Sequence, residues 1–519
     1  MGKKYVDAAK KIKTELSRYS KNSILWLSLQ ALEGSGTDPI NRAKAMPNIL
    51  FLLVKWSMQT HGALGRDITK KEFNAIANDI YQLQPLAAVL DDTNPFTLKI
   101  RSLLMQQVAC QTDDVSDMLA LARQRMWFCD DSTGYYREKF LLAAGISLDN
   151  FFAIAFYFVS LAFGEKPGQL CKVSQANVLI QLTPSISVDD LASFLKLTAT
   201  RSSKLPEFFS TFREDECPTW EYFSETPFVT KPLILEGKNV IVSNRKVLLR
   251  SMGSFVSNFL KTAFREDFKK KFGETMERYV ETLLIRNQVN HINEDKIAVI
   301  YTREKKKGKL VDFLIEDAGR IFLDAKAIEP NDYTSTCVDP TALRERLTSS
   351  YIKAIWQGQE CSHNLSGLAD FPKKSTFMLV VVHQDHFIST GQKVETELFP
   401  ELTKEIVAKY GALHIPLQHI YYVTIHDLEC LLAFCRVNGK DISEFLTDSA
   451  RLDADALTAK MVFHMHLPKP DTGHYDDSLA DLSEIYLDQL SSVIQANAKY
   501  WNGKVGEYYA IWNHFSQLI

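Results

Sequence analysis

Asp312, Asp324 and Lys326 are the side chains of this sequence whose types and spacing could carry out chemistry together. They lie in the otherwise apolar stretch Gly308–Ala327 (GKLVDFLIEDAGRIFLDAKA). Two carboxylates about 5 Å apart repel each other unless a cation lies between them. Carboxylate oxygens are ligands that divalent cations prefer, and a nearby amine stabilises negative charge on a phosphate. This set of side chains therefore predicts a divalent-metal site that acts on phosphodiester bonds.

A β-hairpin must bring these residues together. The stretch predicts two strands, Lys309–Glu316 and Arg320–Ala327, joined by the loop Asp317-Ala318-Gly319. A three-residue hairpin loop favours a residue with positive φ at its end, so we expect Gly319 to adopt that conformation.

The register of the hairpin decides whether the two aspartates meet. If Glu316 pairs with Arg320, then Asp312 falls directly opposite Asp324 and on the same face. Lys326 is two residues beyond Asp324, so the period-two alternation of a strand places its ammonium on that face too. A slip of one residue would move Asp312 to the other face and separate the carboxylates.

These residues resemble a known sequence pattern. Asp312, eleven intervening residues and Asp324-Ala325-Lys326 are similar to the motif of the PD-(D/E)xK, or restriction-endonuclease-like, nuclease superfamily. Upstream, Gly273–Val280 (GETMERYV) resembles the first core helix of that superfamily, which often carries an acidic residue, here Glu277. One departure is Val311, which stands where the motif is named for a proline.

The resemblance covers roughly residues 240–436 and implies a core with the order helix, three strands, helix, strand (αβββαβ). Lys296–Thr302 is expected as the first strand, and the hairpin supplies the next two. Thr341–Gln359 is the expected second helix, and Thr376–His383 has the apolar composition of a buried central strand. A further strand is expected at Ile420–Ile425.

The resemblance also implies roles for the site residues. Asp312, Asp324 and the backbone carbonyl of Ala325 would bind Mg²⁺, for which Mn²⁺ can substitute. Glu277 would bind a second ion or position a water molecule. Lys326 would hold or help to deprotonate the attacking water and offset negative charge in the transition state.

The helix that carries Glu277 can be oriented from its apolar residues. These form a stripe at spacings of three and four: Met276, Tyr279, Val280, Leu283 and Leu284. Glu277 borders this stripe, so its carboxylate can reach toward the edge of the sheet. A solvent-facing glutamate at the boundary of the stripe fits the same pattern.

A basic segment lies beside these residues although the whole chain is slightly acidic. Its 519 residues include 60 Lys and Arg and 63 Asp and Glu, a formal net charge of -3, so the chain is not basic throughout. Between Lys269 and Lys309, eleven basic residues stand against six acidic ones, and such an excess attracts a phosphate backbone. A solvated turn at 303–309 is the alternative. The candidate nucleic-acid contacts are Lys305, Lys306, Lys307, Lys309 and Gln357, the last because relatives often place a glutamine or lysine in the second helix.

Composition bounds the class of protein. Hydrophobic residues make up 46% and charged residues 24%, as is ordinary for a soluble globular protein. The longest apolar run, Phe151–Phe163, is too short to span a bilayer core of about 30 Å, so we expect a buried helix and no membrane partner. The eight cysteines form no Cys-x-x-Cys pair and no signal peptide opens the chain, so we expect reduced thiols in a cytoplasmic protein.

The expected fold class is a multi-domain α/β protein. It comprises a large all-helical N-terminal domain (residues 1–225), a nuclease-like domain (226–440) and a helical C-terminal region (441–519). Prolines punctuate a mixed polar stretch at 205–231, where we place the first boundary, and residues 232–243 predict a small hairpin.

Two histidine pairs have the spacing of metal ligands but not the surroundings of a metal site. His383 with His386, and His464 with His466, lack the cysteine or glutamate companions of zinc sites. The chain also has no P-loop sequence, so any dependence on a nucleoside triphosphate would come from a partner.

These patterns together predict a metal-dependent endonuclease with DNA as the expected substrate, although they do not separate DNA from RNA. The large helical flanks resemble those of multi-domain nucleases of bacterial phage defence, so we expect an antiviral role in a homo-oligomer or with a partner protein. The alternative is a catalytically inert nuclease-like module that binds DNA or assembles a complex.

Overall fold

The computed structural model describes residues 2–34, 38–60, 65–88, 95–111, 114–166, 168–214, 216–327, 332–383, 386–468 and 477–519. The chain divides into two compact units. Unit 1 consists of Met1–Asp91, Gln106–Arg265 and Asp477–Ile519, and unit 2 consists of Asp92–Met105 and Glu266–Asp476. Both units are therefore assembled from segments that are far apart in the sequence, with borders other than those of the three predicted domains.

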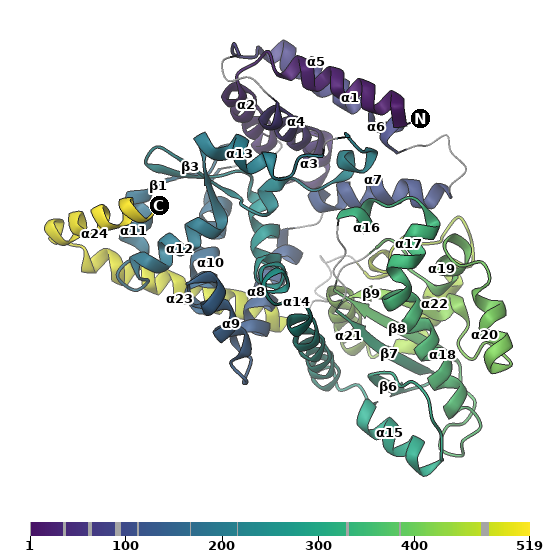
Figure 1. Ribbon diagram of the computed structural model, residues 1–519. Coiled ribbons are helices and arrows are strands. Elements are labelled where there is room, and N and C mark those ends of the chain that lie inside the picture. Colours follow the sequence, from purple (N-terminus) through teal and green to yellow (C-terminus); the bar gives the residue numbers. More distant parts are fainter. Residues whose placement is uncertain are drawn as a thin grey trace. The chain divides into compact units, whose positions relative to one another are not determined.

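Unit 1 is mainly helical (Figure 1). Its helices before the sheet are α1 (Gly2–Leu16), α2 (Lys21–Glu33), α3 (Pro39–Lys44), α4 (Pro47–Gln59), α5 (Lys70–Tyr81), α6 (Gln84–Ala87), α8 (Asp114–Cys129), α9 (Tyr135–Ala144) and α10 (Leu148–Gly164). The rest are α11 (Gln175–Leu182), α12 (Val188–Thr198), α13 (Leu205–Ser210), the 3-10 turns η1 (Ser202–Lys204), η2 (Thr219–Phe223) and η3 (Pro227–Val229), α23 (Asp477–Tyr500) and α24 (Val505–Leu518).

The prediction of an all-helical N-terminal domain is wrong, because unit 1 contains a four-stranded sheet. Its strands, in the order β1-β4-β3-β2, are β1 (Lys172–Ser174), β4 (Asn239–Val242), β3 (Leu233–Glu236) and β2 (Ala199–Arg201). The hairpin predicted at 232–243 is confirmed as the antiparallel pair β3–β4, but it joins strands of unit 1. Strands β1 and β2 have three residues each, too few to show an alternating pattern.

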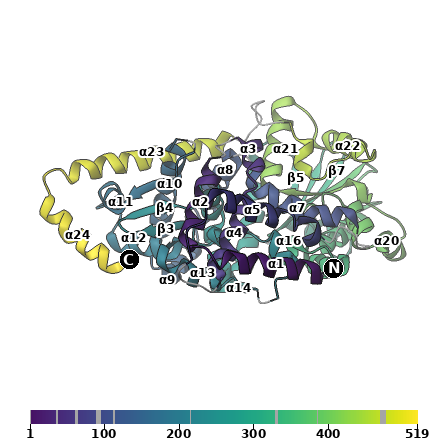
Figure 2. The same cartoon turned by 90° about the horizontal axis from the view of Figure 1, so that it is seen from above.

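The apolar run that was expected as a buried helix forms α10. Ser147 caps it by accepting a hydrogen bond from the backbone N–H of Asn150 (3.2 Å). Helix α23 lies along α8, α10 and α11 in both views (Figures 1 and 2). In the part of the chain that the structure describes, no single helix has the length and apolar composition to cross a membrane. Helices α9 and α10 have this length and composition only when taken together, and the pair is bent by 73°.

Two helices run across the borders of the units. One is α7 (Phe96–Gln111) and the other is α14 (Arg245–Arg286). Helix α14 is interrupted at Arg265, whose backbone (φ 43°, ψ -112°) is not helical. The predicted core helix at 273–280 is the part of α14 after this break.

Unit 2 is built around a five-stranded sheet in the order β5-β6-β7-β8-β9. The strands are β5 (His291–Asn293), β6 (Phe313–Glu316), β7 (Arg320–Lys326), β8 (Thr376–Val382) and β9 (Ile420–Thr424). The helices are α15 (Glu294–Arg303), α16 (Asp332–Thr336), α17 (Pro340–Leu347), the π-turn η4 (Thr348–Ile352), α18 (Lys353–Leu365), α19 (Gly391–Glu397), α20 (Leu402–Tyr410), η5 (Leu417–His419), α21 (Ile425–Asn438), α22 (Ile442–Asp453) and η6 (Phe463–His466).

The sheet of unit 2 is mixed and covered on both faces. Strands β5, β6 and β7 are antiparallel neighbours, whereas β7, β8 and β9 run parallel. The face with Phe322 and Val380 packs on a core that includes Leu347 and Ile355 of the α17–α18 helices. Helix α21 lies behind the sheet in Figure 1 and packs on β8 and β9.

The expected first strand, Lys296–Thr302, is wrong: these residues belong to helix α15, and the strand is β5. The Asn293 side chain caps the helix by accepting from the backbone N–H of Lys296 (3.3 Å), and two acidic residues follow it. A strand would bury Ile297, Val299 and Tyr301 on one face. Val299 is 68% exposed instead, because only the helical spacing of Ile297 and Tyr301 points into the core.

The predicted hairpin register is confirmed, since Glu316 pairs with Arg320. The role expected for Gly319 is wrong, because it is not among the residues with positive φ. Its lack of a side chain serves a close approach instead: a Cβ there would lie 2.7 Å from the Cβ of Ser443. The Gly319 N–H donates to the Ser443 hydroxyl (2.8 Å).

Candidate active site

The hairpin places the two aspartates on one face of the sheet of unit 2. The register of β6 and β7 pairs Phe313 with Leu323, and carried one residue further it sets Asp312 opposite Asp324. Asp312 lies just before β6, and its Oδ2 accepts a hydrogen bond from the backbone N–H of Ala325 (2.6 Å). This bond holds the Asp312 carboxylate against β7, beside Asp324.

Lys326 lies on the same face, as the alternation of β7 requires. Its Nζ is 2.5 Å from Oδ2 of Asp324, which has no exposed surface. Apart from this ion pair, neither carboxylate oxygen of Asp324 has a hydrogen-bond donor among the described residues. A buried carboxylate in this condition is costly unless it is protonated or bound by a cation.

The acidities of the two aspartates reflect this crowding. Burial and then the charge of Asp324 raise the pKa of Asp312 well above its usual value. Burial also raises the pKa of Asp324, although the Lys326 ammonium opposes the rise. The pair therefore holds two negative charges only at a cost that a divalent cation would offset.

The charge of Glu277 acts on the same pair, since it contributes to raising the pKa of Asp312. It is half-buried on α14, and burial raises its pKa, followed by the charges of Glu294 and Asp324. The apolar stripe expected beside it is confirmed as buried: Met276, Tyr279, Val280, Leu283 and Leu284.

Two charged residues near the site were not assigned from the sequence. The charge of Lys353, at the start of α18, lowers the pKa of Asp324, and that of Glu294 raises it. Glu294 could not be oriented while its segment was expected to form a strand. For Lys353, the sequence feature that indicates a place near the site is its position one helical turn before Gln357.

Gln357 lies beside the chain that leads into β6. Its Nε2 donates to the backbone carbonyl of Leu310 (3.2 Å), two residues before Asp312. Its Oε1 is buried and has no hydrogen-bond partner in the described part of the chain. Farther along α18, Asn364 Nδ2 donates to the carbonyl of Lys307 (3.2 Å), so this helix supports the whole approach to the hairpin.

The four lysines expected to contact nucleic acid lie in the loop between α15 and β6. All of them are exposed, and none forms an ion pair within the described ranges: Lys305, Lys306, Lys307 and Lys309. Arg303, at the end of α15, differs from them because Asp370 and Glu304 neutralise it.

The oxygen ligands offered by this site fit a hard divalent cation, because Asp324 is buried with unsatisfied oxygens. However, no group of three or more His, Cys, Asp or Glu side chains among the described residues stands ready to hold a metal ion. Asp312 is hydrogen-bonded to Ala325, and Lys326 occupies one side of Asp324. A cation would therefore share Asp324 with the lysine.

Comparison of the chain with protein-family models, curated proteins and solved structures finds no match. The assignment of the site consequently rests on its geometry and chemistry.

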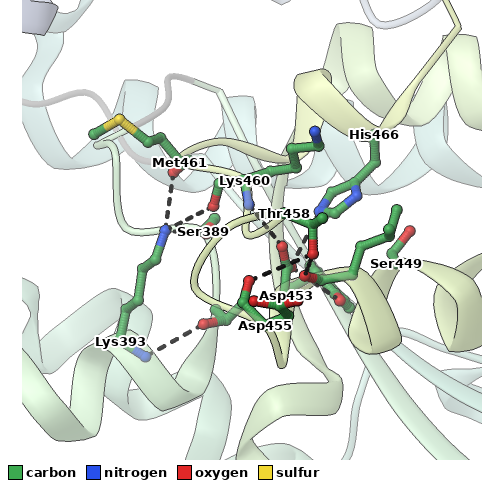
Figure 3. A network of polar contacts seen from close by, with 12 residues as sticks. Ser389, Lys393, Ser449, Asp453, Asp455, Thr458, Lys460, Met461 and His466 are labelled. Atoms are coloured by element: carbon green, nitrogen blue, oxygen red, sulfur yellow. Dashed lines mark hydrogen bonds and ion pairs between the residues drawn. The ribbon is translucent and has the colours of Figure 1, made fainter.

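The histidines at 464 and 466 have structural partners. His464 Nδ1 lies 3.0 Å from Asp427 Oδ1, and His466 Nε2 lies 3.0 Å from Asp453 Oδ2. Figure 3 shows His466 and Asp453 in a polar network, in which Asp453 Oδ1 also accepts from the backbone N–H of Lys460 (2.8 Å). These contacts hold η6 in place.

Proposed function

We propose that this chain is a metal-dependent nuclease that hydrolyses phosphodiester bonds at Asp312, Asp324 and Lys326. The observation that carries the proposal is the fully buried Asp324, which lies beside a second carboxylate and has one ammonium as its counter-charge. A purely structural ion pair would be accompanied by hydrogen bonds that satisfy the carboxylate, and those are missing among the described residues.

The order of elements supports the same proposal. After the break at Arg265, the chain runs through α14, β5, β6, β7, the α17–α18 helices and β8, which follows the order αβββαβ. Helix α15, between the first two strands, and helix α16, after the third strand, are additions to this order. Asp312 lies just before the second strand, Asp324 lies on the third strand and Glu277 lies on the first helix, similar to the resemblance described above.

In this proposal each residue has a chemical task. Asp312 and Asp324, with the carbonyl of Ala325, would hold Mg²⁺ or Mn²⁺, which would supply charge stabilisation at the phosphate and lower the pKa of a water molecule. Lys326 orients the attacking water and offsets charge that develops on the phosphate oxygens. Glu277, whose pKa is raised, accepts a proton or positions the water.

A second candidate function is a catalytically inert module that binds nucleic acid. The observation in its favour is that no three candidate ligands converge in the described part of the chain, while Lys326 already compensates Asp324. A part in antiviral defence stays a prediction of the sequence resemblance.

Incubation of the full chain with supercoiled plasmid and with linear DNA separates the two candidates. We expect nicking or degradation with Mg²⁺ or Mn²⁺ and none with EDTA. Asp324→Asn and Lys326→Met should abolish cleavage, whereas Lys296→Met, an exposed lysine on α15, should not. Cleavage at the wild-type rate in both site variants would refute the assignment, and DNA binding without cleavage under any metal would favour the inert module.

A further inference from the structure

A surface cluster of aromatic rings lies on α18 and α20, away from the proposed metal ligands. The ring centroids of Trp356 and Tyr410 are 6.2 Å apart, and those of His363 and Tyr410 are 5.4 Å apart. His414 continues the row, 4.8 Å from His363. All four side chains are half-buried, so each presents part of its ring to solvent while the remainder packs on the protein.

The local sequence explains why these rings meet. Trp356 and His363 are seven residues apart on α18 and therefore share a face of that helix. Tyr410 is the last residue of α20, and Gly411 follows with φ 81°, a left-handed C-cap that turns the chain back. The turn brings His414 to His363, with 3.0 Å between Nε2 and Nδ1.

Positive charge accompanies the rings. Lys409 Nζ lies 5.4 Å from the centroid of Trp356 and 4.8 Å from that of Tyr410. Lys306, from the basic loop, is near enough to His363 to contribute, after burial and His414, to lowering its pKa. Glu360 is the acidic group of the cluster; it accepts from the Tyr410 hydroxyl (3.1 Å) and lies 3.9 Å from Lys409.

The cluster and the proposed active site share one helix. Lys353, whose charge reaches Asp324, begins α18, and His363 lies ten residues later. At 1.5 Å per residue this separation is about 15 Å. Between them Gln357 contacts the chain that leads into β6.

We propose that this surface binds single-stranded nucleic acid, with bases stacked on Trp356 and Tyr410 and phosphates held by Lys306 and Lys409. The proposal rests on the proposed nuclease function and narrows its substrate class. A single strand exposes the flat face of every base, whereas a duplex hides these faces, so partly exposed rings beside lysines favour a single strand. Lysines alone would bind either form through its phosphates.

Binding of fluorescein-labelled oligothymidylate, oligouridylate and a matched DNA duplex to the full chain in EDTA tests this surface by fluorescence anisotropy. Trp356→Leu and Tyr410→Leu should each weaken single-strand binding by roughly tenfold or more and leave duplex binding unchanged. Trp356→Phe and Tyr410→Phe keep a ring and should retain most of the affinity. Comparison of the thymidylate and uridylate arms shows which of the two single strands binds more tightly.

Wild-type affinity for the single strands in both leucine variants would overturn the proposal, as would an equal loss for single strand and duplex. Trp356 and Tyr410 both pack on the core as well, so unchanged duplex affinity in each leucine variant shows that a loss of single-strand binding does not come from unfolding. Stacking without any Mg²⁺-dependent cleavage would overturn the proposed function alone, and cleavage without stacking would overturn this inference alone.

Discussion

Asp324 is the residue on which the proposed chemistry depends, and its burial leads to a thermodynamic prediction. Because its pKa is raised in the folded protein, the ionised carboxylate disfavours folding, and the unfolding free energy falls as pH rises above the pKa of the unfolded chain. Asp324→Asn should therefore preserve or raise stability at neutral pH. Lys326→Met leaves a buried carboxylate without its counter-charge and should lower stability by about 3–5 kcal/mol.

Urea unfolding at neutral pH measures the unfolding free energy of both variants, which should not fall for Asp324→Asn and should fall for Lys326→Met. The double variant should recover most of the stability that Lys326→Met loses. Both single variants should lose cleavage by about 100-fold or more. A loss of stability of equal size in the two variants would indicate an ordinary structural salt bridge.

His386 gives a second prediction at the residue scale. Its ring is fully buried, its Nδ1 lies 3.4 Å from Nη2 of Arg101, and burial followed by the Arg101 charge lowers its pKa to about 3. The unfolded chain takes up a proton near pH 6.5 while the folded chain does not, so stability is full above that pH and is lost as pH falls toward 3. Near pH 5 the loss should be about 2 kcal/mol.

Replacing the histidine by a neutral side chain isolates this contribution from the carboxylates that titrate in the same range. The difference in unfolding free energy between the wild type and His386→Asn, measured in urea at neutral pH and near pH 5, should shift by about 2 kcal/mol in favour of the variant. An unchanged difference would contradict the assignment of a neutral, buried imidazole.

At the scale of elements, the sequence alone predicts the structure correctly where a segment shows a single hydrophobic periodicity. The hairpin register followed from alternation and one turn, so Asp312, Asp324 and Lys326 could be placed on a common face. The segment at 296–302 carries apolar residues at spacings of both two and four, so its pattern fits a strand as well as a helix. The Asn293 cap and the packing of the segment favour the helix. Glu294 could not be oriented until that helix was known.

The turn of the hairpin yields a prediction about Gly319. Gly319→Ala places a Cβ about 2.7 Å from that of Ser443, so one of two packed segments must shift. We expect a loss of about 1–3 kcal/mol in the unfolding free energy, together with weaker cleavage because β7 carries two site residues.

Gly273→Ala is the matched control, because that glycine lies in a helix with open space around its Cβ position. It should be neutral or stabilising by up to about 1 kcal/mol, since alanine is the better helix former. Equal thermal midpoints for the two alanine variants would show that the close approach at Gly319 does not constrain the hairpin.

At the scale of the whole molecule, local patterns could not reveal which distant segments assemble together. The strands of unit 1 pair across residues 172–242, which no pattern within one segment could indicate. The net charge of -3 is equally uninformative without its distribution, because four lysines without ion pairs in the described part of the chain gather in one loop.

This distribution predicts the salt dependence of nucleic-acid binding. Replacing Lys305, Lys306, Lys307 and Lys309 together by alanine should reduce the slope of log affinity against log salt by up to about 3–4, because each contacted phosphate releases counterions. Replacing four exposed lysines of α1 makes the same change in net charge and should leave the slope unchanged: Lys3, Lys4, Lys10 and Lys11. Equal effects of both quadruple variants would mean that only total charge matters.

Helix α23 has a consequence for biogenesis. It covers α8, α10 and α11 with side chains such as Tyr486, which meets Phe156, and Trp501, which donates to the carbonyl of Thr183 (2.7 Å). These residues leave the ribosome only after every segment of unit 2 has been synthesised. The nascent chain must therefore carry an uncovered apolar surface on its earlier-made half while the later-made half folds.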